Sequence, residues 1–157
     1  MDVQIFAGST SDIGYIKELV EVLKELDISY DVKIISAHRN PMELMKIIKE
    51  SEANVFIAIA GLSAALPGFI SSLTLKPVIG IPLSGKVPLD SLLSMVQMPK
   101  GVPIGVVGID NVKNGALLAA RIISLYDAKV RENLKNYIKK ENDKALESGK
   151  KALEDMI

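Results

Sequence analysis

Residues that can bind anions or move protons gather in three short segments, each of which directly follows a run of apolar residues. The first segment is Gly8-Ser9-Thr10-Ser11-Asp12, the second covers residues 36–41, and the third covers residues 60–68. Hydroxyls, an imidazole, a guanidinium and small residues are the types that a site for a phosphorylated small molecule needs. These segments are therefore candidates for one site.

The first segment lies between a predicted strand and a predicted helix. Backbone N–H groups at a helix start, together with the hydroxyls of Ser9, Thr10 and Ser11, would form an anion cradle suited to phosphate. Plain helix capping by Ser11 or Asp12 explains the same residues without any ligand. The segment carries neither the dinucleotide-binding fingerprint nor the P-loop pattern.

The second segment holds the only His of the chain, His38, beside Arg39. An unperturbed His has a pKa of about 6.5, and a nearby helix start would favour the neutral form that accepts a proton. Arg39 offers a forked donor for phosphate or carboxylate. The alternative is a solvated loop His next to a surface Arg.

Small residues dominate the third segment, Ala60-Gly61-Leu62-Ser63-Ala64-Ala65-Leu66-Pro67-Gly68. They would let the backbone approach a ligand closely, or they would only allow tight helix–sheet packing. A fourth polar group consists of Asp90, Ser91, Ser94 and Gln97. Capping of a short helix explains Asp90 equally well.

Composition excludes several classes of function. The 157 residues carry 19 Lys and Arg against 19 Asp and Glu, so no basic excess draws the chain to nucleic acid or anionic lipid. The chain has no Cys and one His, which excludes a thiolate nucleophile and a metal site built from His or Cys. The G-x-S-x-G elbow of serine hydrolases is not present. No apolar run is long enough to span a membrane, and we expect a cytoplasmic protein of one main domain.

Apolar runs of strand length alternate with segments of helical period. We expect strands at residues 3–7, 31–35, 55–59, 77–81 and 102–107. We expect helices at residues 11–26, from Asn40-Pro41 onward, and at 63–73, 88–95 and 114–125, the last of them fully buried. The alternation of strands and helices along the chain predicts a three-layer α/β/α domain with a parallel sheet of about five strands, flavodoxin-like or Rossmann-like. Ligands of such sheets bind beyond the carboxyl ends of the strands, where the polar segments lie.

Residues 127–157 differ in character, because they are strongly charged and carry apolar residues at roughly helical spacing. A sheet domain covering residues 1–126 does not need them. We expect a helical extension that packs on neighbouring subunits, and the alternative is a helix that lies back over its own core or frays at its end.

Taken together, the segments resemble one family. GSTSD (8–12), SAHRNP (36–41), AGLSAALPG (60–68), PVIGIP (77–82) and DSLLSMVQMPKGVPIG (90–105) occur in the order and spacing of the 5-(carboxyamino)imidazole ribonucleotide mutases. That family includes the aminoimidazole ribonucleotide carboxylases of purine synthesis. The similarity covers about residues 3–126.

The resemblance implies a homo-octamer with active sites at subunit junctions, a ribonucleotide substrate and CO2, and no metal or organic cofactor. It implies functional coupling to an ATP-dependent carboxyaminoimidazole ribonucleotide synthase, and it points to neither nucleic acid nor membrane. Site roles transfer by motif position. His38 is the implied general acid/base. The implied substrate-binding residues are Ser9, Asp12 and Arg39 around the ribose phosphate with added contacts from Ser11, then Ser36, and Gly61, Ser63, Ala64 and Leu66 around the carboxylate or CO2.

One departure from the family pattern leaves the substrate class open. Most bacterial mutases have a second His where this chain has Ala65. The alternatives are therefore a carboxylase that uses free CO2 and a ribonucleotide-binding paralogue without activity. A generic flavodoxin-like or receiver-like signalling domain ranks last, because Ser9 and Thr10 stand where a receiver carries its acidic cluster.

Overall fold

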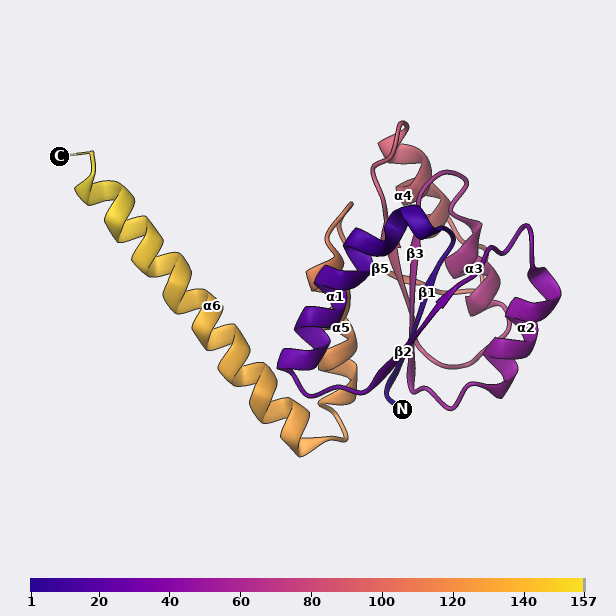
Figure 1. Ribbon diagram of the computed structural model, residues 1–157, viewed down its shortest axis with the longest axis horizontal. Coiled ribbons are helices and arrows are strands. Elements are labelled where there is room, and N and C mark those ends of the chain that lie inside the picture. The colour runs from indigo at the N-terminus through magenta and orange to yellow at the C-terminus, as the bar shows by residue number, and fades with distance from the viewer. Residues whose placement is uncertain (157) are drawn as a thin grey trace.

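A five-stranded parallel sheet forms the middle layer of the computed structural model, which describes residues 1–156 apart from the side chain of Pro88 (Figure 1). The strands lie in the order β2-β1-β3-β4-β5. Their bounds are Val3–Ala7 (β1), Tyr30–Ile34 (β2), Val55–Ala60 (β3), Val78–Pro82 (β4) and Gly105–Val106 (β5). This strand order is flavodoxin-like, so the predicted fold class is confirmed in its flavodoxin-like form.

The three inner strands β1, β3 and β4 are buried along their whole length, as expected for parallel strands covered on both faces. The edge strand β5 is much shorter than the predicted 102–107. It pairs with β4 only at Gly105 and Val106. Pro103 has no N–H to donate to a ladder, which accounts for the late start of this strand.

Helices cover both faces of the sheet (Figure 1). They are α1 (Ile13–Glu25), α2 (Pro41–Glu50), α3 (Ala65–Ser71), α4 (Pro88–Val96), α5 (Val112–Ile123) and α6 (Ala128–Glu154), with a short 3-10 helix η1 (Thr10–Asp12) before α1. One core joins the sheet to α1, α5 and the start of α6, and the other joins it to α2, α3 and α4. The three-layer α/β/α prediction is therefore confirmed.

Helix α5 corrects the expectation of a fully buried helix at 114–125. It starts earlier, at Val112, where the Asn111 side chain accepts a hydrogen bond of 3.2 Å from the N–H of Asn114. Small residues such as Ala116 and Ala119 face the core, whereas Arg121 is exposed. The helix is amphipathic because it belongs to an outer layer of the domain, where one face packs on the sheet and positions such as Arg121 face solvent.

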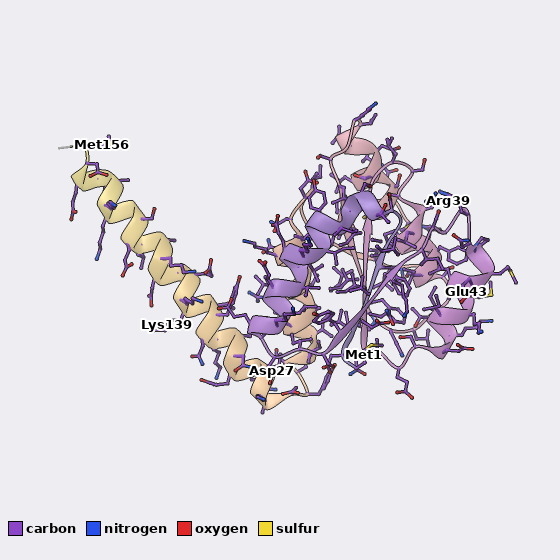
Figure 2. The ribbon with its side chains drawn as sticks, in the orientation of Figure 1. Met1, Asp27, Arg39, Glu43, Lys139 and Met156 are labelled. Carbon is purple, nitrogen blue, oxygen red and sulfur yellow. The ribbon has the colours of Figure 1, made fainter. Side chains whose placement is uncertain are left out.

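Helix α6 confirms that the charged tail is helical. Its first turns lie on the domain through buried Val130 and Leu134, and Lys140 pairs with Glu25 of α1 at 2.6 Å. Beyond this ion pair, the rest of the helix extends away from the domain (Figure 2). Ile157, the last residue of the predicted extension, lies outside the described residues. No helix among residues 1–156 is long and apolar enough to cross a membrane.

Candidate active site

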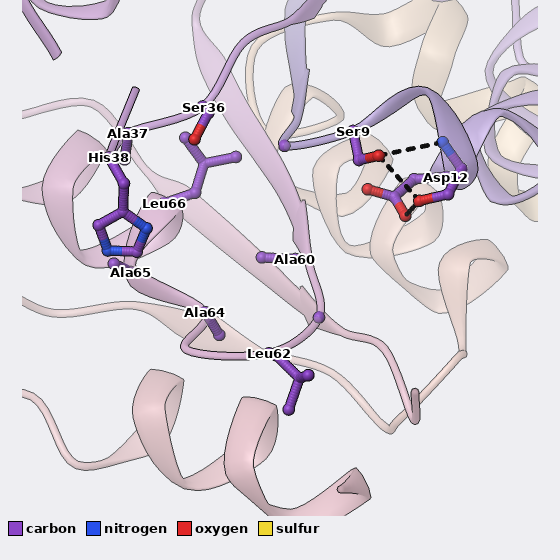
Figure 3. A pocket seen from close by; sticks show the side chains of 13 residues that line it. Ser9, Asp12, Ser36, Ala37, His38, Ala60, Leu62, Ala64, Ala65 and Leu66 are labelled. Atoms are coloured by element: carbon purple, nitrogen blue, oxygen red, sulfur yellow. Dashed lines mark hydrogen bonds between the residues drawn. The ribbon is translucent and has the colours of Figure 1, made fainter. Parts of the chain in front are cut away.

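The three polar segments meet in one pocket of about 250 Å³ beyond the carboxyl ends of β1, β2 and β3. In the order β2-β1-β3, the connections after β1 and β3 leave toward opposite faces of the sheet, and such a switch point is where open α/β sheets bind ligands. Its lining consists of Gly8, Ser9, Ser11, Asp12, Ser36, Ala37, His38, Ala60, Gly61, Leu62, Ala64, Ala65 and Leu66 (Figure 3).

The loop after β1 is closed by its own hydroxyls. Ser9, rather than Ser11 or Asp12, caps the first turn, because its hydroxyl oxygen accepts a hydrogen bond of 3.2 Å from the N–H of Ser11. The Ser11 hydroxyl lies 2.9 Å from the Ser9 oxygen and 3.0 Å from a carboxylate oxygen of Asp12. Capping and ligand binding are therefore compatible, since the capping residue also lines the pocket.

His38 is held in a tight turn between β2 and α2. The N–H of Asn40 donates to the Ser36 carbonyl at 2.9 Å, and this turn presents the exposed His38 ring to the pocket. In Figure 3 the imidazole lies beside Ala65, across the pocket from Ser9 and Asp12. A ligand that fills the pocket therefore lies between the imidazole and the hydroxyl loop. Asn40 occupies the N-cap position of α2, but its side chain makes no capping bond.

Arg39 does not line the pocket in this structure. Its Nη2 donates a hydrogen bond of 3.2 Å to the carbonyl of Gly8, which is itself a lining residue. Arg39 therefore lies at the rim, where it ties the second segment to the first (Figure 2). A guanidinium carries five N–H donors, so others stay available to an anion.

Ser63 is the second predicted site residue outside the pocket lining. Its backbone is in the left-handed region with φ of 59°, and its N–H donates to a carboxylate oxygen of Asp90 at 2.6 Å. The N–H of Ala64 donates to the carbonyl of Gly61 at 3.1 Å, which closes the turn. Gly61, Ala64 and Leu66 line the pocket while Ser63 is directed elsewhere.

The structure thus brings together the side chains of Ser9, Ser11, Asp12, Ser36 and His38 with Gly61, Ala64 and Leu66. Sequence reasoning omitted five further lining residues, Gly8, Ala37, Ala60, Leu62 and Ala65, from the set. None of them has a polar side chain, so residue type could not single them out. Their position in the same strand-following segments was the available signal.

Asp12 is the one acidic residue of this lining, and the lining contains neither Lys nor Arg for an anionic ligand. Among residues 1–156, no group of three or more His, Cys, Asp or Glu is placed to hold a metal ion. Binding of an anion there therefore depends on the backbone N–H groups of the first loop and on Arg39 at the rim.

A polar cluster outside the pocket fixes the neighbouring loops. Burial raises the pKa of Asp110, but hydrogen bonds from Ser84 and Tyr15 outweigh it and hold that pKa below its ordinary 3.8. Burial and the Asp110 carboxylate raise the pKa of the Tyr15 hydroxyl. The Ser84 N–H donates to Asp110 at 2.9 Å. The cluster ties the start of α1 to the loops after β4 and β5.

Known proteins match this chain along most of its length. The sequence profile of a family described as AIR carboxylase matches residues 2–144. The N5-carboxyaminoimidazole ribonucleotide mutase of Methanocaldococcus jannaschii is 46% identical over 151 residues, which cover 96% of each chain. The mutase of the same name from Pyrococcus horikoshii is 46% identical over 98% of this chain and 89% of that protein. The crystal structure of Treponema denticola PurE has a TM-score of 0.85 at 34% identity, covering 95% of this chain and 96% of that one.

Proposed function

Because the chain belongs to the AIR carboxylase family, we propose that it is an N5-carboxyaminoimidazole ribonucleotide mutase of purine biosynthesis. The reaction moves a carboxylate from the exocyclic nitrogen of an imidazole ribonucleotide to the neighbouring ring carbon. The observation that carries the proposal is the pocket at the switch point, where the single imidazole of the chain lies across from a hydroxyl loop at a helix start.

The proposed chemistry needs one group that both donates and accepts a proton. Cleavage of the bond between the exocyclic nitrogen and the carboxyl carbon releases CO2, and His38 donates a proton to that nitrogen. The ring carbon then attacks CO2, and His38 takes the proton that this carbon must lose. His38 ends in its starting state, while the carboxylate and one hydrogen have exchanged places. A His titrates near neutral pH and suits both steps.

The rest of the pocket supports this chemistry by position. In this proposal, the first-loop N–H groups and Ser9 bind the phosphate, and Arg39 supplies positive charge from the rim. Asp12 and Ser11 are placed to bind ribose hydroxyls, because a carboxylate accepts hydroxyl hydrogens and repels phosphate. Small apolar residues, among them Gly61, Ala64 and Leu66, wall the part of the pocket that would hold CO2.

The second candidate is a carboxylase that combines free CO2 with the uncarboxylated ribonucleotide. Ala65, which lines the pocket beside His38, favours it, because a methyl group supplies no second proton carrier. The decarboxylation half of the mutase reaction would then be absent, and only the attack on CO2 and the loss of the ring proton would remain.

A paired assay tests the function. Purified protein receives either the carboxyamino ribonucleotide or the uncarboxylated ribonucleotide with bicarbonate, and the ring-carboxylated product is measured in each. Product from the first substrate at low bicarbonate supports the mutase, whereas product only from the second assigns the carboxylase. If neither yields product but calorimetry detects tight binding of the ribonucleotide, the chain is a binding module and the proposal is wrong.

The proposal includes a homo-octamer in which α6 packs on neighbouring subunits. Exposed apolar side chains on α4 and α6 support it, and they include Leu89, Leu93, Leu146 and Leu153. Multi-angle light scattering at micromolar concentration tests the assembly, and a monomeric mass would contradict it. Because an N-carboxylated amine is labile in water, a synthase that carboxylates the amine at the expense of ATP would have to supply the substrate.

A further inference from the structure

Asp90 makes a contact that neither helix capping nor the proposed chemistry uses. It belongs to the first turn of α4, yet the N-cap of α4 is Val87 and no side chain caps that helix end. The Asp90 carboxylate instead reaches the loop after β3, where it accepts the hydrogen bond from the Ser63 N–H at 2.6 Å. We infer that Asp90 is a positioning residue that holds this loop closed as one wall of the CO2 pocket; the inference rests on the proposed function.

The element that carries Asp90 is rigidly seated. The hydroxyl of Ser91, which is buried, donates to the carbonyl of Leu83 at 2.7 Å, just after β4. Met95 is 1% exposed, and an added Cβ on Gly80 would lie 2.9 Å from the Met95 sulfur. Helix α4 therefore contacts the middle of β4 closely, and Asp90 presents its carboxylate from a fixed position.

The loop that Asp90 holds needs such a contact. Ser63 has φ of 59°, a left-handed conformation that residues with a side chain adopt at a cost. A hydrogen bond from a backbone N–H to a carboxylate is charge-assisted and roughly twice as strong as a neutral one. Without it, Ser63 is free to return to the right-handed region, and its neighbours on both sides would then turn with the backbone.

Those neighbours form the pocket wall. Leu62 and Ala64 flank Ser63 and line the pocket, and Leu62 is 61% exposed, so few other contacts hold it. An opened loop would let CO2 leave before the ring carbon attacks it. His38 has then already given its proton to the exocyclic nitrogen, the ring carbon keeps its hydrogen, and His38 recovers a proton from water. The released product is the uncarboxylated ribonucleotide plus CO2.

The test is therefore the partition between carboxyl transfer and carboxyl loss. Wild-type protein and the Asp90→Ala and Asp90→Asn variants are given the carboxyamino ribonucleotide, and both products are quantified after subtraction of non-enzymatic decarboxylation. We expect the ratio of loss to transfer to rise about tenfold or more in Asp90→Ala, and by less in Asp90→Asn, which keeps a neutral acceptor. Glu43→Gln is the matched control, because Glu43 is the acidic residue in the first turn of α2, and its ratio should equal that of the wild type.

A purely structural role of Asp90 would lower the total rate without changing this ratio, and that result would overturn the inference. Amide hydrogen exchange followed by NMR gives a readout that needs no turnover. The Ser63 amide should exchange faster in Asp90→Ala than in the wild type, and equal exchange would overturn the inference. If the wild type makes no transfer product, the proposed function fails, and the exchange experiment still decides whether Asp90 holds the loop.

Discussion

The contact between α5 and β4 permits a quantitative prediction for Gly115→Ala. A Cβ added to Gly115 would lie 2.3 Å from Cδ1 and 2.9 Å from Cγ1 of Ile81, a fully buried side chain of β4 in the middle layer. Carbon atoms in contact normally stay about 3.5–4.0 Å apart. Ile81 or the helix would therefore have to shift by more than about 1 Å.

The expected change in the free energy of unfolding combines two opposing effects. Overpacking a tight core costs about 1–3 kcal/mol, and the large shift required places this site at the upper end. Replacing Gly by Ala in a helix interior gains about 0.5–1 kcal/mol. We expect a net loss of about 2 kcal/mol, which lowers the melting temperature of a domain of this size by about 4–8 °C.

The assay is differential scanning calorimetry at one fixed protein concentration, because the proposed assembly would make the melting temperature depend on concentration. Gly149→Ala in α6 is the matched control, since no atom lies within 4 Å of its added Cβ, and its melting temperature should stay the same or rise. Adding Ile81→Val removes the clashing Cδ1 and should make the double variant more stable than Gly115→Ala alone. If Gly115→Ala is as stable as the wild type, the packing argument is wrong.

The remaining predictions concern the site and its surroundings. His38→Asn should lower turnover by about 100- to 10,000-fold while leaving the melting temperature nearly unchanged, because His38 is exposed; retained activity in the paired assay would refute the acid/base role. Arg39→Ala should raise KM for the ribonucleotide by about 10- to 100-fold with a smaller change in kcat. Arg39→Lys should restore only part of the lost affinity for the ribonucleotide, and an unchanged KM in Arg39→Ala would show that Arg39 does not belong to the binding site. Asp110→Asn should destabilise the protein at pH 7 and by less at pH 3. The pKa of Asp110 is lower in the folded protein than its ordinary 3.8, so the ionised carboxylate stabilises the fold above pH 3.8, and this contribution disappears as the pH falls through the folded-state pKa. A difference in melting temperature that does not change with pH would contradict this.

The arrangement of strands and helices could be predicted well, because periodicity reports burial. The run at residues 3–7 is strand β1, and the charged tail is helix α6, as predicted. The edge strand β5 was predicted too long, since an apolar run does not reveal that Pro103 keeps the chain out of the ladder. The prediction that α5 is fully buried was wrong for a similar reason, because Ala is common in both buried and half-buried helices.

Some residues of the candidate site could be predicted from their side-chain chemistry, whereas Gly61, Ala64 and Leu66 could be predicted only from the family resemblance. His38 was identified by type and by position after a strand, Asp12 was identified as a site residue by the resemblance, and both line the pocket. The contact between Asp90 and the Ser63 N–H joins residues 27 positions apart in the chain, and a backbone donor carries no signature in the sequence. Reasoning from one sequence therefore identified Asp90 as a polar residue on a short helix and missed its partner.

The polar contacts of the three loops indicate why so small a pocket is enough. Each loop has a fixing hydrogen bond to which its lining side chains do not contribute: Arg39 to the Gly8 carbonyl, Asn40 to the Ser36 carbonyl, and Ser63 to Asp90. The first loop is also closed by bonds among Ser9, Ser11 and Asp12. The lining is thereby preorganised before any ligand arrives, which lowers the entropic cost of orienting a reactant. CO2 is uncharged and binds no group strongly, so the best that a protein can do is to surround it with small apolar walls and keep those walls shut. In the proposed reaction, the loop anchors rather than additional catalytic groups would determine whether the carboxyl group reaches the ring carbon or escapes.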